Sequence, residues 1–463
     1  MTDRQSFQDL LDGKPDLVDY FYNDAKPWHA SAAPGGPVPP AYSNWRDEQL
    51  ATAETAALLH QTYILPALYL KGPDALKLLS RIAVNGFANY GFDRGKQFVA
   101  VSPNGYLIGD CILYRHGEES FELVSGAPVL NWVIYHAETG GYDVETVLDE
   151  SLNNNPTGRR RRYRFEICGP NAKEIFASCI EGEMPDIGFF RFARVRIAGK
   201  DVMVLRHGMT GSYAVELSGP YDDQDAVRDH ILKVGEGPGL KPMGMTAYYG
   251  GSHGGWIPYP VPGILTDPAA ADYRRYLPAH TFEAGYQLGG SFVGSDISDY
   301  YATPYDFGYE KIIKFDHDFF GREALEKIPD DAKRKKVSLV WNHDDIMKVL
   351  GSQFGKRSRY KAINFPSLSY AWKQCDEVRN GRGDLVGLSL NVSYVCTYGE
   401  VVSIALLEQG PHTAIGTEVL ITWGEPNGGS RKPQVERHEQ TTIRATVAEV
   451  PFQHDIQRNV TAR

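Results

Sequence analysis

Cysteine is scarce in this chain of 463 residues, and long apolar runs are absent. The five cysteines, Cys111, Cys168, Cys179, Cys375 and Cys396, are scattered and never form a C-x-x-C pair. The sequence therefore predicts neither a disulfide framework nor a zinc site. No stretch approaches the roughly 18 apolar residues of a membrane span, and the first residues are polar, unlike a secretory signal. We expect a cytoplasmic protein with no metal site.

Positive charge is also limited. The chain carries 48 Lys and Arg against 58 Asp and Glu, a formal net charge of −10, whereas a duplex nucleic-acid binder needs clustered cations. The sequence strings of NTP-binding loops, dinucleotide-binding turns and zinc proteases are missing. These absences favour a protein that acts on a small molecule, with no nucleic-acid or membrane partner. They do not exclude an anionic substrate.

Glycine, proline and aromatic residues are plentiful, with 47 Gly, 28 Pro and 12% aromatics. In residues 33–40 (APGGPVPP), proline fixes φ and lacks the N–H while glycine costs backbone entropy, so neither a helix nor an inner strand can form. We therefore predict that residues 1–45 are an irregular extension. Its aromatic side chains need something to cover, which makes it either an arm strapped over the body or a lid on a pocket.

A strand, a Gly-Pro break and a helix occur twice, in residues 68–79 and again in residues 165–176. Proline in the first helical turn with an acidic residue close by is typical of a helix start. The repeat predicts two related α+β units. From residue 335 onward, short strand patterns alternate with turns, which predicts an all-β terminal domain and a boundary near residue 330.

Two charged features stand near these units. Residues 106–124 are predicted to form a β-hairpin that carries Asp110 inside an apolar strand.

The four arginines of residues 159–162 are predicted to form a solvated loop edge rather than a phosphate or nucleic-acid site.

Residues 244–290 follow no helical or strand period. Within them, residues 247–260 (AYYGGSHGGWIPYP) carry four large aromatics on a glycine-rich backbone, with no helix or strand pattern. Long irregular loops in compact domains are usually functional or disordered, and this composition is too aromatic for disorder. We interpret the segment as a wall of a pocket for planar ligands. Ordinary aromatic packing beneath a surface loop is the alternative.

Several strings in order resemble one family. They are residues 41–49 (AYSNWRDEQ), 105–110 (GYLIGD), 206–211 (RHGMTG), 255–258 (GWIP), 289–293 (GGSFV), 299–301 (DYY), 314–319 (KFDHDF) and 422–425 (TWGE). Together they resemble the tetrahydrofolate-dependent aryl O-demethylases, which act on vanillate and syringate and belong to the aminomethyltransferase (glycine-cleavage T-protein) superfamily. The resemblance covers residues 40–450.

The resemblance implies an α+β fold, a three-domain cloverleaf with folate in its central channel. The expected parts are an N-terminal extension or lid (1–45), a first α+β folate-binding domain (46–155 plus 246–330), a second one (156–245) and a C-terminal β-barrel (331–455).

Tetrahydrofolate is the cofactor that the resemblance implies. Tyr248 matches the family's catalytic tyrosine and is expected to act as general acid or positioning group, because a departing phenolate needs a proton. Glu216 matches the acid that takes the pterin N–H groups, and carboxylates suit such donors. The other expected cofactor residues are Asp110, Glu166, which stands where relatives have glutamine, Phe189, Trp256 and Val124. Solvated acids and plain core packing are the alternatives for these positions.

The substrate side departs from the family. Gly126 stands where vanillate demethylases have an arginine that pairs with the substrate carboxylate. The expected substrate-binding residues are Gln61, which is kept, His29 and Ser31 in place of tyrosines, Ile64 in place of a histidine, and Trp28, Tyr249 and His253. These changes predict either a neutral or bulkier methoxyarene, or a carboxylate held by another group such as His29, His253 or Arg274.

The leading hypothesis is an enzyme that moves a methyl group from a methoxylated, lignin-derived aromatic to tetrahydrofolate. The products would be a phenol and 5-methyltetrahydrofolate. Two alternatives stay open: demethylation of a sulfur or nitrogen methyl compound, and a folate-binding protein without catalysis.

Overall fold

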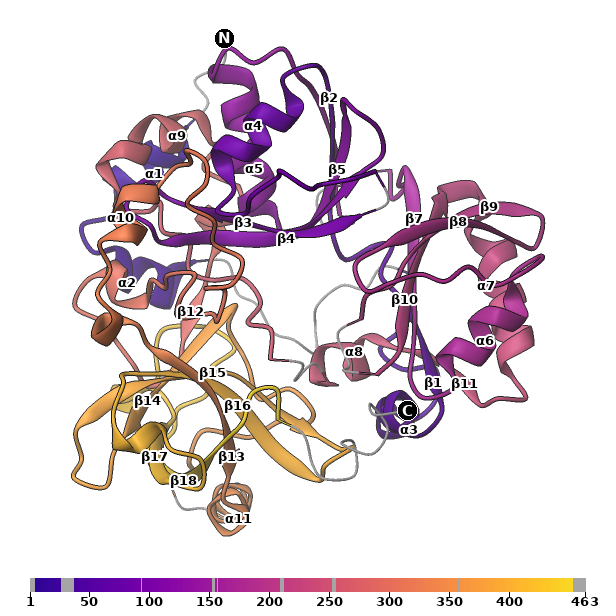
Figure 1. The fold of residues 1–463 in the computed structure, drawn as a ribbon. Helices are drawn as coiled ribbons and strands as arrows, with labels where there is room; N and C mark the ends of the chain where they lie inside the picture. Colours follow the sequence, from indigo (N-terminus) through magenta and orange to yellow (C-terminus); the bar gives the residue numbers. More distant parts are fainter. Residues whose placement is uncertain are drawn as a thin grey trace.

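The computed structural model describes residues 5–25, 37–92, 94–151, 155, 157–208, 212–251, 255–355 and 358–452. Three β-sheets arranged around a centre, with helices outside, form the body (Figure 1). None of the described helices has the length and apolar character that crossing a membrane requires.

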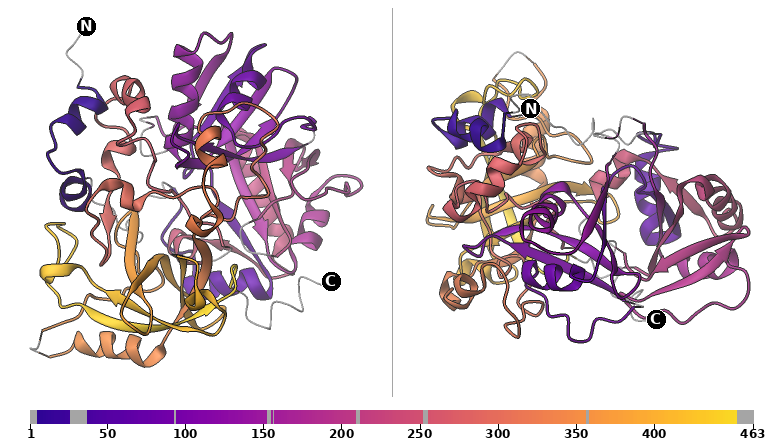
Figure 2. Two further views of the ribbon diagram at one scale, coloured as in Figure 1. Left: turned by 60° about the vertical axis from the view of Figure 1, so that its left-hand side comes forward. Right: turned by 90° about the horizontal axis from the view of Figure 1, so that it is seen from above.

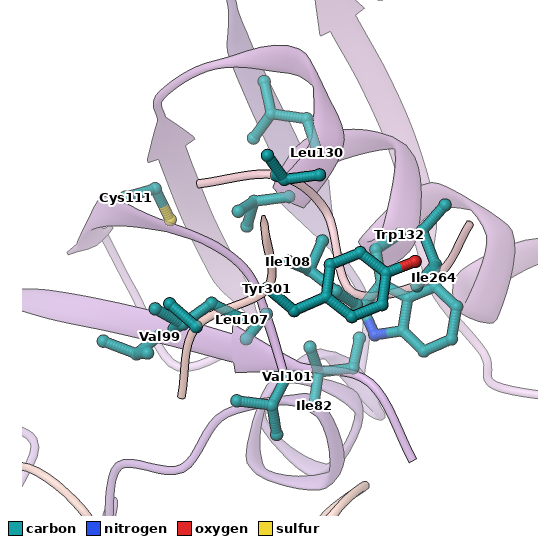
Figure 3. Close-up of a cluster of buried hydrophobic side chains, with 14 of the residues drawn as sticks. Ile82, Val99, Val101, Leu107, Ile108, Cys111, Leu130, Trp132, Ile264 and Tyr301 are labelled. Atoms are coloured by element: carbon teal, nitrogen blue, oxygen red, sulfur yellow. The ribbon is translucent and has the colours of Figure 1, made fainter. Parts of the chain in front are cut away.

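The first unit is a five-stranded sheet in the order β3-β4-β5-β2-β6, with every neighbouring pair antiparallel. Two helices pack with it and bury an apolar core, in which Ile108, Trp132 and Ile264 lie close together (Figure 3). The elements are β2 (Ala67–Lys71), α4 (Ala75–Ile82), β3 (Gly95–Val101), β4 (Leu107–Arg115), β5 (Ser120–Val124), α5 (Ala127–Thr139) and β6 (Glu145–Asp149).

The second unit is a six-stranded sheet in the order β11-β1-β7-β10-β9-β8. Its elements are β1 (Ala56–His60), β7 (Arg162–Cys168), α6 (Ala172–Cys179), β8 (Phe192–Ile197), β9 (Lys200–Leu205), β10 (Ala214–Pro220), α7 (Gln224–Gly235) and β11 (Leu240–Met243). β1 belongs to this sheet through its pairing with β7 and β11, and α3 (Trp45–Glu54) packs beside it. The limits of the domains remain a prediction.

The predicted repeat is confirmed as β2 followed by α4 and β7 followed by α6. The glycine of each break has a positive φ, +150° at Gly72 and +124° at Gly169. At both glycines a side chain would also strike backbone, since an added β-carbon would lie 2.2 Å from the carbonyl oxygen of Asp143 or 2.7 Å from that of Thr55. Close packing therefore requires glycine at the turn of each unit.

The C-terminal unit is a closed barrel, because β14 pairs with both β15 and β17 and the strands run β14-β15-β16-β13-β18-β17. The predicted strands are confirmed, and with them the α+β class with a terminal β-barrel. The elements are β13 (Lys335–Trp341), α11 (His343–Ser352), β14 (Lys373–Arg379), β15 (Leu385–Val395), β16 (Glu400–Leu407), β17 (Glu418–Trp423) and β18 (Thr441–Ala448). The short strand β12 (Leu288–Gly289) joins β14 in parallel.

The connections between and within these units contain short helices. They are α8 (Met245–Gly251), α9 (Ala271–Tyr276), α10 (Arg322–Glu326) and single 3-10 turns at Tyr221–Asp223, Pro268–Ala270, Glu283–Gly285, Ile297–Tyr300, Asp330–Ala332, Pro411–Thr413 and Pro426–Gly428.

The prediction of an irregular N-terminal segment is confirmed for residues 37–44, which contain no helix or strand, and is wrong for residues 5–25. Residues 5–25 contain α1 (Phe7–Asp12), α2 (Leu17–Asp19) and a π-helical turn (Tyr20–Asp24). α1 packs against α9 and the π-helical turn against β12, at the edge of the molecule near the N-terminus (Figure 2). A capping box between Ser6 and Asp9 starts α1, and Phe7 and Phe21 are fully buried. The Nζ atom of Lys432, paired with buried Glu425 at 2.7 Å, donates to the Tyr22 carbonyl at 2.7 Å.

The arginine run was also predicted wrongly at one position. Arg160 is buried, with Nε 3.2 Å from Oδ1 of Asp149 and Nη2 2.9 Å from the Leu65 carbonyl. The sequence of the run predicts a solvated edge. The topology instead buries this guanidinium at the end of β6, where it donates hydrogen bonds to groups from other parts of the chain.

Replacing Gly72 with alanine tests the close approach at the repeat. We expect Gly72→Ala to lower the free energy of unfolding by about 2 kcal/mol more than Gly182→Ala, because a clash adds to the shared cost of a positive φ. Gly182 has φ +90° but nothing within 4 Å of its added β-carbon. Urea unfolding of both variants measures the difference, and equal losses would contradict the packing argument.

Candidate active site

A cavity of about 1140 Å³ lies where the three units meet. Its walls include Asp110 on β4, Arg164 on β7, Glu216 on β10, Tyr248 on α8 and Lys336 on β13. Pockets for one small ligand usually measure about 300–1,000 Å³. The cavity therefore has room for two ligands side by side.

Asp110 is held by donors that converge on one of its two oxygens. Oδ2 accepts hydrogen bonds from Gln97 Nε2 at 2.9 Å, Trp256 Nε1 at 3.0 Å and the Tyr309 hydroxyl at 3.2 Å. Oδ1 has one longer contact, 3.3 Å from Trp256 Nε1. Burial raises the pKa of Asp110, and these donors oppose the rise. The carboxyl group is thus fixed in place while Oδ1 keeps capacity for a ligand donor.

Lys336 brings a positive charge to this wall from the barrel. Its Nζ atom donates to the Gly255 carbonyl at 2.9 Å, one residue before Trp256. Burial lowers the pKa of Lys336, and the charge of Asp110 acts in the opposite direction. Sequence reasoning missed Lys336, Gln97 and Tyr309. A polar Gln97 inside the apolar strand Gly95–Val101, which pairs with the strand of Asp110, was a usable signal.

Glu216 lies on the opposite wall, and its side chain is 12% exposed. The Tyr114 hydroxyl donates to Oε2 at 3.1 Å, and His207 Nε2 lies 3.8 Å from Oε1. Among the described residues, the buried Nδ1 atom of His207 has no hydrogen-bond partner. Glu216 and His207 together offer acceptor and donor groups to a ligand in the cavity.

Gln61 and Glu166 form a second polar pair beside Glu216. Glu166 is opposite Glu216 in the register of β7 and β10, and it is fully buried. Gln61, predicted to contact substrate, lines the cavity and donates from Nε2 to Oε2 of Glu166 at 2.9 Å. The predicted pair of acids is therefore adjacent, as cross-strand neighbours in a sheet are.

Tyr248 projects into the cavity from α8, in a segment for which no helix was predicted. The glycines that argued against a helix serve close packing instead: an added β-carbon would lie 2.5 Å from Ala41 Cα at Gly244 and 2.2 Å from Pro366 Cγ at Gly250. Among the described residues, the Tyr248 hydroxyl has no hydrogen-bond partner. Burial raises the pKa of Tyr248 well above its ordinary value, and nearby Tyr249 and Glu166 add to the rise. The phenol stays protonated.

Of the other predicted site residues, some line the cavity and some do not. Val124, Phe189 and Trp256 line the cavity, whereas Ile64 and Tyr249 lie in an apolar cluster next to Tyr248 and are not on the cavity wall. Trp28, His29, Ser31 and His253 lie outside the described residues. The individual roles of all these residues remain predictions.

Arg274, one of the cations considered for a substrate carboxylate, does not line this cavity. Its guanidinium is buried, with Nε 2.7 Å from Gln8 Oε1 and Nη1 2.7 Å from the Asp267 carbonyl. It stabilises the packing of α1 near α9.

A buried ion pair joins the first and second sheets at the cavity. Glu122 on β5 pairs with Arg164 on β7 and accepts a hydrogen bond from His116 Nε2 at 2.8 Å. Burial opposes ionisation of Glu122, but the charge of Arg164 and the His116 contact outweigh it and lower the pKa of Glu122 to about 2. The Arg164 guanidinium lies 5.4 Å from the ring centre of Tyr114, whose hydroxyl holds Glu216.

Comparison with known proteins places the chain in a family. Residues 20–249 match the model described as the GCVT N-terminal domain. Syringate O-demethylase of Sphingobium sp. (strain NBRC 103272 / SYK-6) is 40% identical over 449 residues, which cover 97% of this chain and 96% of that protein. Sesamin methylene transferase of Sinomonas sp. (strain No.22) is 28% identical over 450 residues, covering 92% and 93%.

A solved structure agrees on the fold. The aminomethyltransferase T of the glycine cleavage system from Bartonella henselae matches with a TM-score of 0.57 at 19% identity, over 93% of this chain and 94% of that one. The chain belongs to the aminomethyltransferase superfamily, and within it to the group that contains the tetrahydrofolate-dependent aryl O-demethylases. The expectation of a tetrahydrofolate-dependent methyltransferase is confirmed.

Replacing Glu122 tests the ion pair between the sheets. Glu122→Gln leaves the Arg164 guanidinium buried without its counter-ion, so we expect a loss of about 3–5 kcal/mol in the free energy of unfolding. Glu326→Gln, at a half-exposed surface pair, is the matched control and should change little.

The same pair predicts a pH dependence. The folded pKa of Glu122 is about 2, below the ordinary value of about 4.3, so its stabilisation is present above about pH 4.3 and is lost as the pH falls toward 2. The difference in unfolding midpoint between the natural protein and Glu122→Gln should therefore shrink over that range. A difference that stays constant from pH 6 to pH 2.5 would contradict the assignment.

Proposed function

We propose that the protein transfers a methyl group from a methoxylated aromatic compound to tetrahydrofolate, giving a phenol and 5-methyltetrahydrofolate. One observation carries the proposal: a single cavity joins a protonated phenol, Tyr248, to two carboxylates on facing sheets, Asp110 and Glu216. The similarity to a syringate O-demethylase along nearly the whole chain supports the same chemistry.

The residues present fit a reduced pterin. Its amino and ring N–H groups are donors, and Glu216 and Oδ1 of Asp110 are acceptors that face the cavity. Val124, Phe189 and Trp256 supply apolar surface for flat rings. When bound, tetrahydrofolate supplies the nucleophilic nitrogen that takes the methyl carbon.

Tyr248 serves the other half of the reaction. As the bond between the methyl carbon and the aryl oxygen breaks, its electron pair stays on the oxygen, which needs a hydrogen-bond donor and then a proton. Tyr248 remains protonated at neutral pH and donates to that oxygen. The proton balance would close, because the acceptor nitrogen of tetrahydrofolate would give up one proton in exchange for the methyl group. The reaction therefore consumes no added acid.

We place this reaction in the cytoplasm. The described cysteines Cys111, Cys168, Cys179, Cys375 and Cys396 are all free thiols, and four are buried. Unpaired cysteines are typical of proteins from reducing compartments.

The direct test is incubation with tetrahydrofolate and a panel of methoxyarenes, followed by mass spectrometry of the folate. We expect 5-methyltetrahydrofolate and the matching phenol in equal amounts with at least one donor. The proposal fails if folate is methylated only by sulfur or nitrogen methyl compounds, or by no donor at all.

Tyr248→Phe separates catalysis from binding. The variant keeps the ring and loses the donor, so we expect kcat to fall by about 10²–10⁴-fold with KM for the methoxyarene nearly unchanged. Tyr276→Phe, at a partly exposed tyrosine on α9, is the matched control and should retain full activity. An unchanged kcat in Tyr248→Phe would contradict the role of Tyr248 as the donor to the leaving oxygen.

Glu216→Gln tests the folate side. A carboxylate that accepts hydrogen bonds from the pterin contributes about 1.5–3 kcal/mol, so we expect the variant to weaken tetrahydrofolate binding by about 10–100-fold. Calorimetric titration without methyl donor measures the effect. The methoxyarene KM should stay within about twofold, and a loss confined to the methoxyarene would reverse the assignment of the two ligands.

A further inference from the structure

The Tyr259 ring fills the space on the cavity wall that a side chain at position 126 would need. Gly126 precedes α5 with φ −66° and ψ 155°, a conformation that any residue adopts. A β-carbon at Gly126 would nevertheless lie 2.2 Å from Cε1 and 2.7 Å from Cδ1 of Tyr259. The ring of Tyr259 therefore stands where a side chain at position 126 would project, and glycine is needed there for space and not for backbone freedom.

Tyr259 is fixed in this position. Its φ is +47°, a strained value for a residue with a side chain. Its ring packs against Trp372 and Phe282, with ring centres 5.5 and 5.6 Å away, and its carbonyl oxygen accepts a hydrogen bond from the Tyr286 hydroxyl. The Lys373 Nζ atom also donates a hydrogen bond to the carbonyl of the preceding residue, Pro258, at 2.7 Å. A strained backbone conformation persists only where surrounding contacts hold it, and these contacts do so for Tyr259.

The Tyr259 side chain brings a neutral hydroxyl group to the cavity wall. Tyr259 lines the cavity, and among the described residues its hydroxyl makes no hydrogen bond. Burial raises the pKa of Tyr259, with further rises from Tyr249 and Asp110, so the phenol stays uncharged. Tyr248 and Tyr259 both line this cavity, so a substrate ring placed at Tyr248 occupies the same cavity as Tyr259.

Two of the cations near this wall already have acidic neighbours, since Arg164 is paired with Glu122 and Lys336 lies close to Asp110. A third, Lys373, donates to the Pro258 carbonyl and is not on the cavity wall, and Lys173 and Arg206 line the cavity from the second unit. Neither Arg164 nor Lys336 is therefore free to neutralise an anionic substituent buried against Tyr259. Burying such a charge without a counter-ion costs binding free energy in a site shielded from water. An uncharged polar substituent needs only the hydrogen bond that Tyr259 offers.

We propose that Tyr259 is the specificity-determining residue for the methyl donor, through a hydrogen bond from its hydroxyl to an uncharged polar substituent on the methoxyarene ring. This inference rests on the proposed function. It predicts selection of ring aldehydes, amides or alcohols over the matching carboxylates, with Gly126 required because it leaves room for the Tyr259 ring.

The first test compares 4-hydroxy-3,5-dimethoxybenzaldehyde with the corresponding benzoate, with tetrahydrofolate in excess. We expect the natural protein to have the higher kcat/KM for the aldehyde. Tyr259→Phe should lose about 5–10-fold with the aldehyde, mainly in KM, and less than twofold with a methoxyphenol that lacks the substituent. Equal losses with all donors, or a loss in kcat alone, would overturn the proposal.

The second test is a double-mutant cycle between positions 126 and 259. Gly126→Ala should lower kcat/KM by at least about 10-fold in the natural protein and have almost no effect in the Tyr259→Ala background, because the clashing ring is gone. Gly381→Ala, whose added β-carbon has nothing within 4 Å, is the control. An identical cost of Gly126→Ala in both backgrounds would overturn the steric argument.

The two proposals can fail separately. If the natural protein methylates no folate with any methoxyarene, the proposed function is wrong, and calorimetric binding of the aldehyde and the benzoate to Tyr259→Phe still decides the role of Tyr259. If turnover occurs but Tyr259→Phe leaves the preference between the two donors unchanged, only the specificity assignment is wrong. Circular dichroism of each variant confirms that it is folded.

Discussion

The buried ion pair between Glu122 and Arg164 is the contact on which the site depends, because it joins the first sheet to the second at the cavity. Without it, β5 and β7 would each present a charged side chain to an apolar interface, at a cost of several kcal/mol. Arg164 also lies against the Tyr114 ring, and the Tyr114 hydroxyl positions Glu216. The orientation of a ligand-facing acid is thus linked to the contact that holds the units together.

Glu122 and Asp110 show how buried carboxyl groups serve two purposes here. A guanidinium lowers the pKa of Glu122 to about 2, which makes it a permanent counter-ion with a structural role. Asp110 is held by neutral donors mainly on Oδ2, and its pKa is raised because burial outweighs them. The second arrangement is less stable, but it leaves Oδ1 able to receive a donor from a ligand. Such tension between stability and binding is typical of functional sites.

Features carried by short stretches of chain were predictable from the sequence. The two α+β repeats, the hairpin around Asp110 and the strands of the barrel follow from local patterns, and the family strings indicated the cavity acids. Lys336 and Arg164 were missed because their partners lie elsewhere in the chain, and only the topology brings them together. Tyr259 belongs to the aromatic segment predicted as a pocket wall, but its contact with Gly126 depends on the topology. α8 was missed because its glycine-rich segment shows no helical pattern, whereas Gly244, just before α8, and Gly250, within it, allow close packing. Arg160 was misjudged for the same reason as Arg164.

The central claim is that one cavity aligns an aryl methyl ether with the acceptor nitrogen of tetrahydrofolate and moves the methyl group intact. Incubation with a methoxyarene carrying a CD₃ group measures this directly, through the isotopic mass of the folate product. The account predicts 5-methyltetrahydrofolate with all three deuterium atoms, together with one equivalent of phenol. A product that retains two deuterium atoms, as transfer of a methylene unit would give, or release of the label as free formaldehyde, would contradict it.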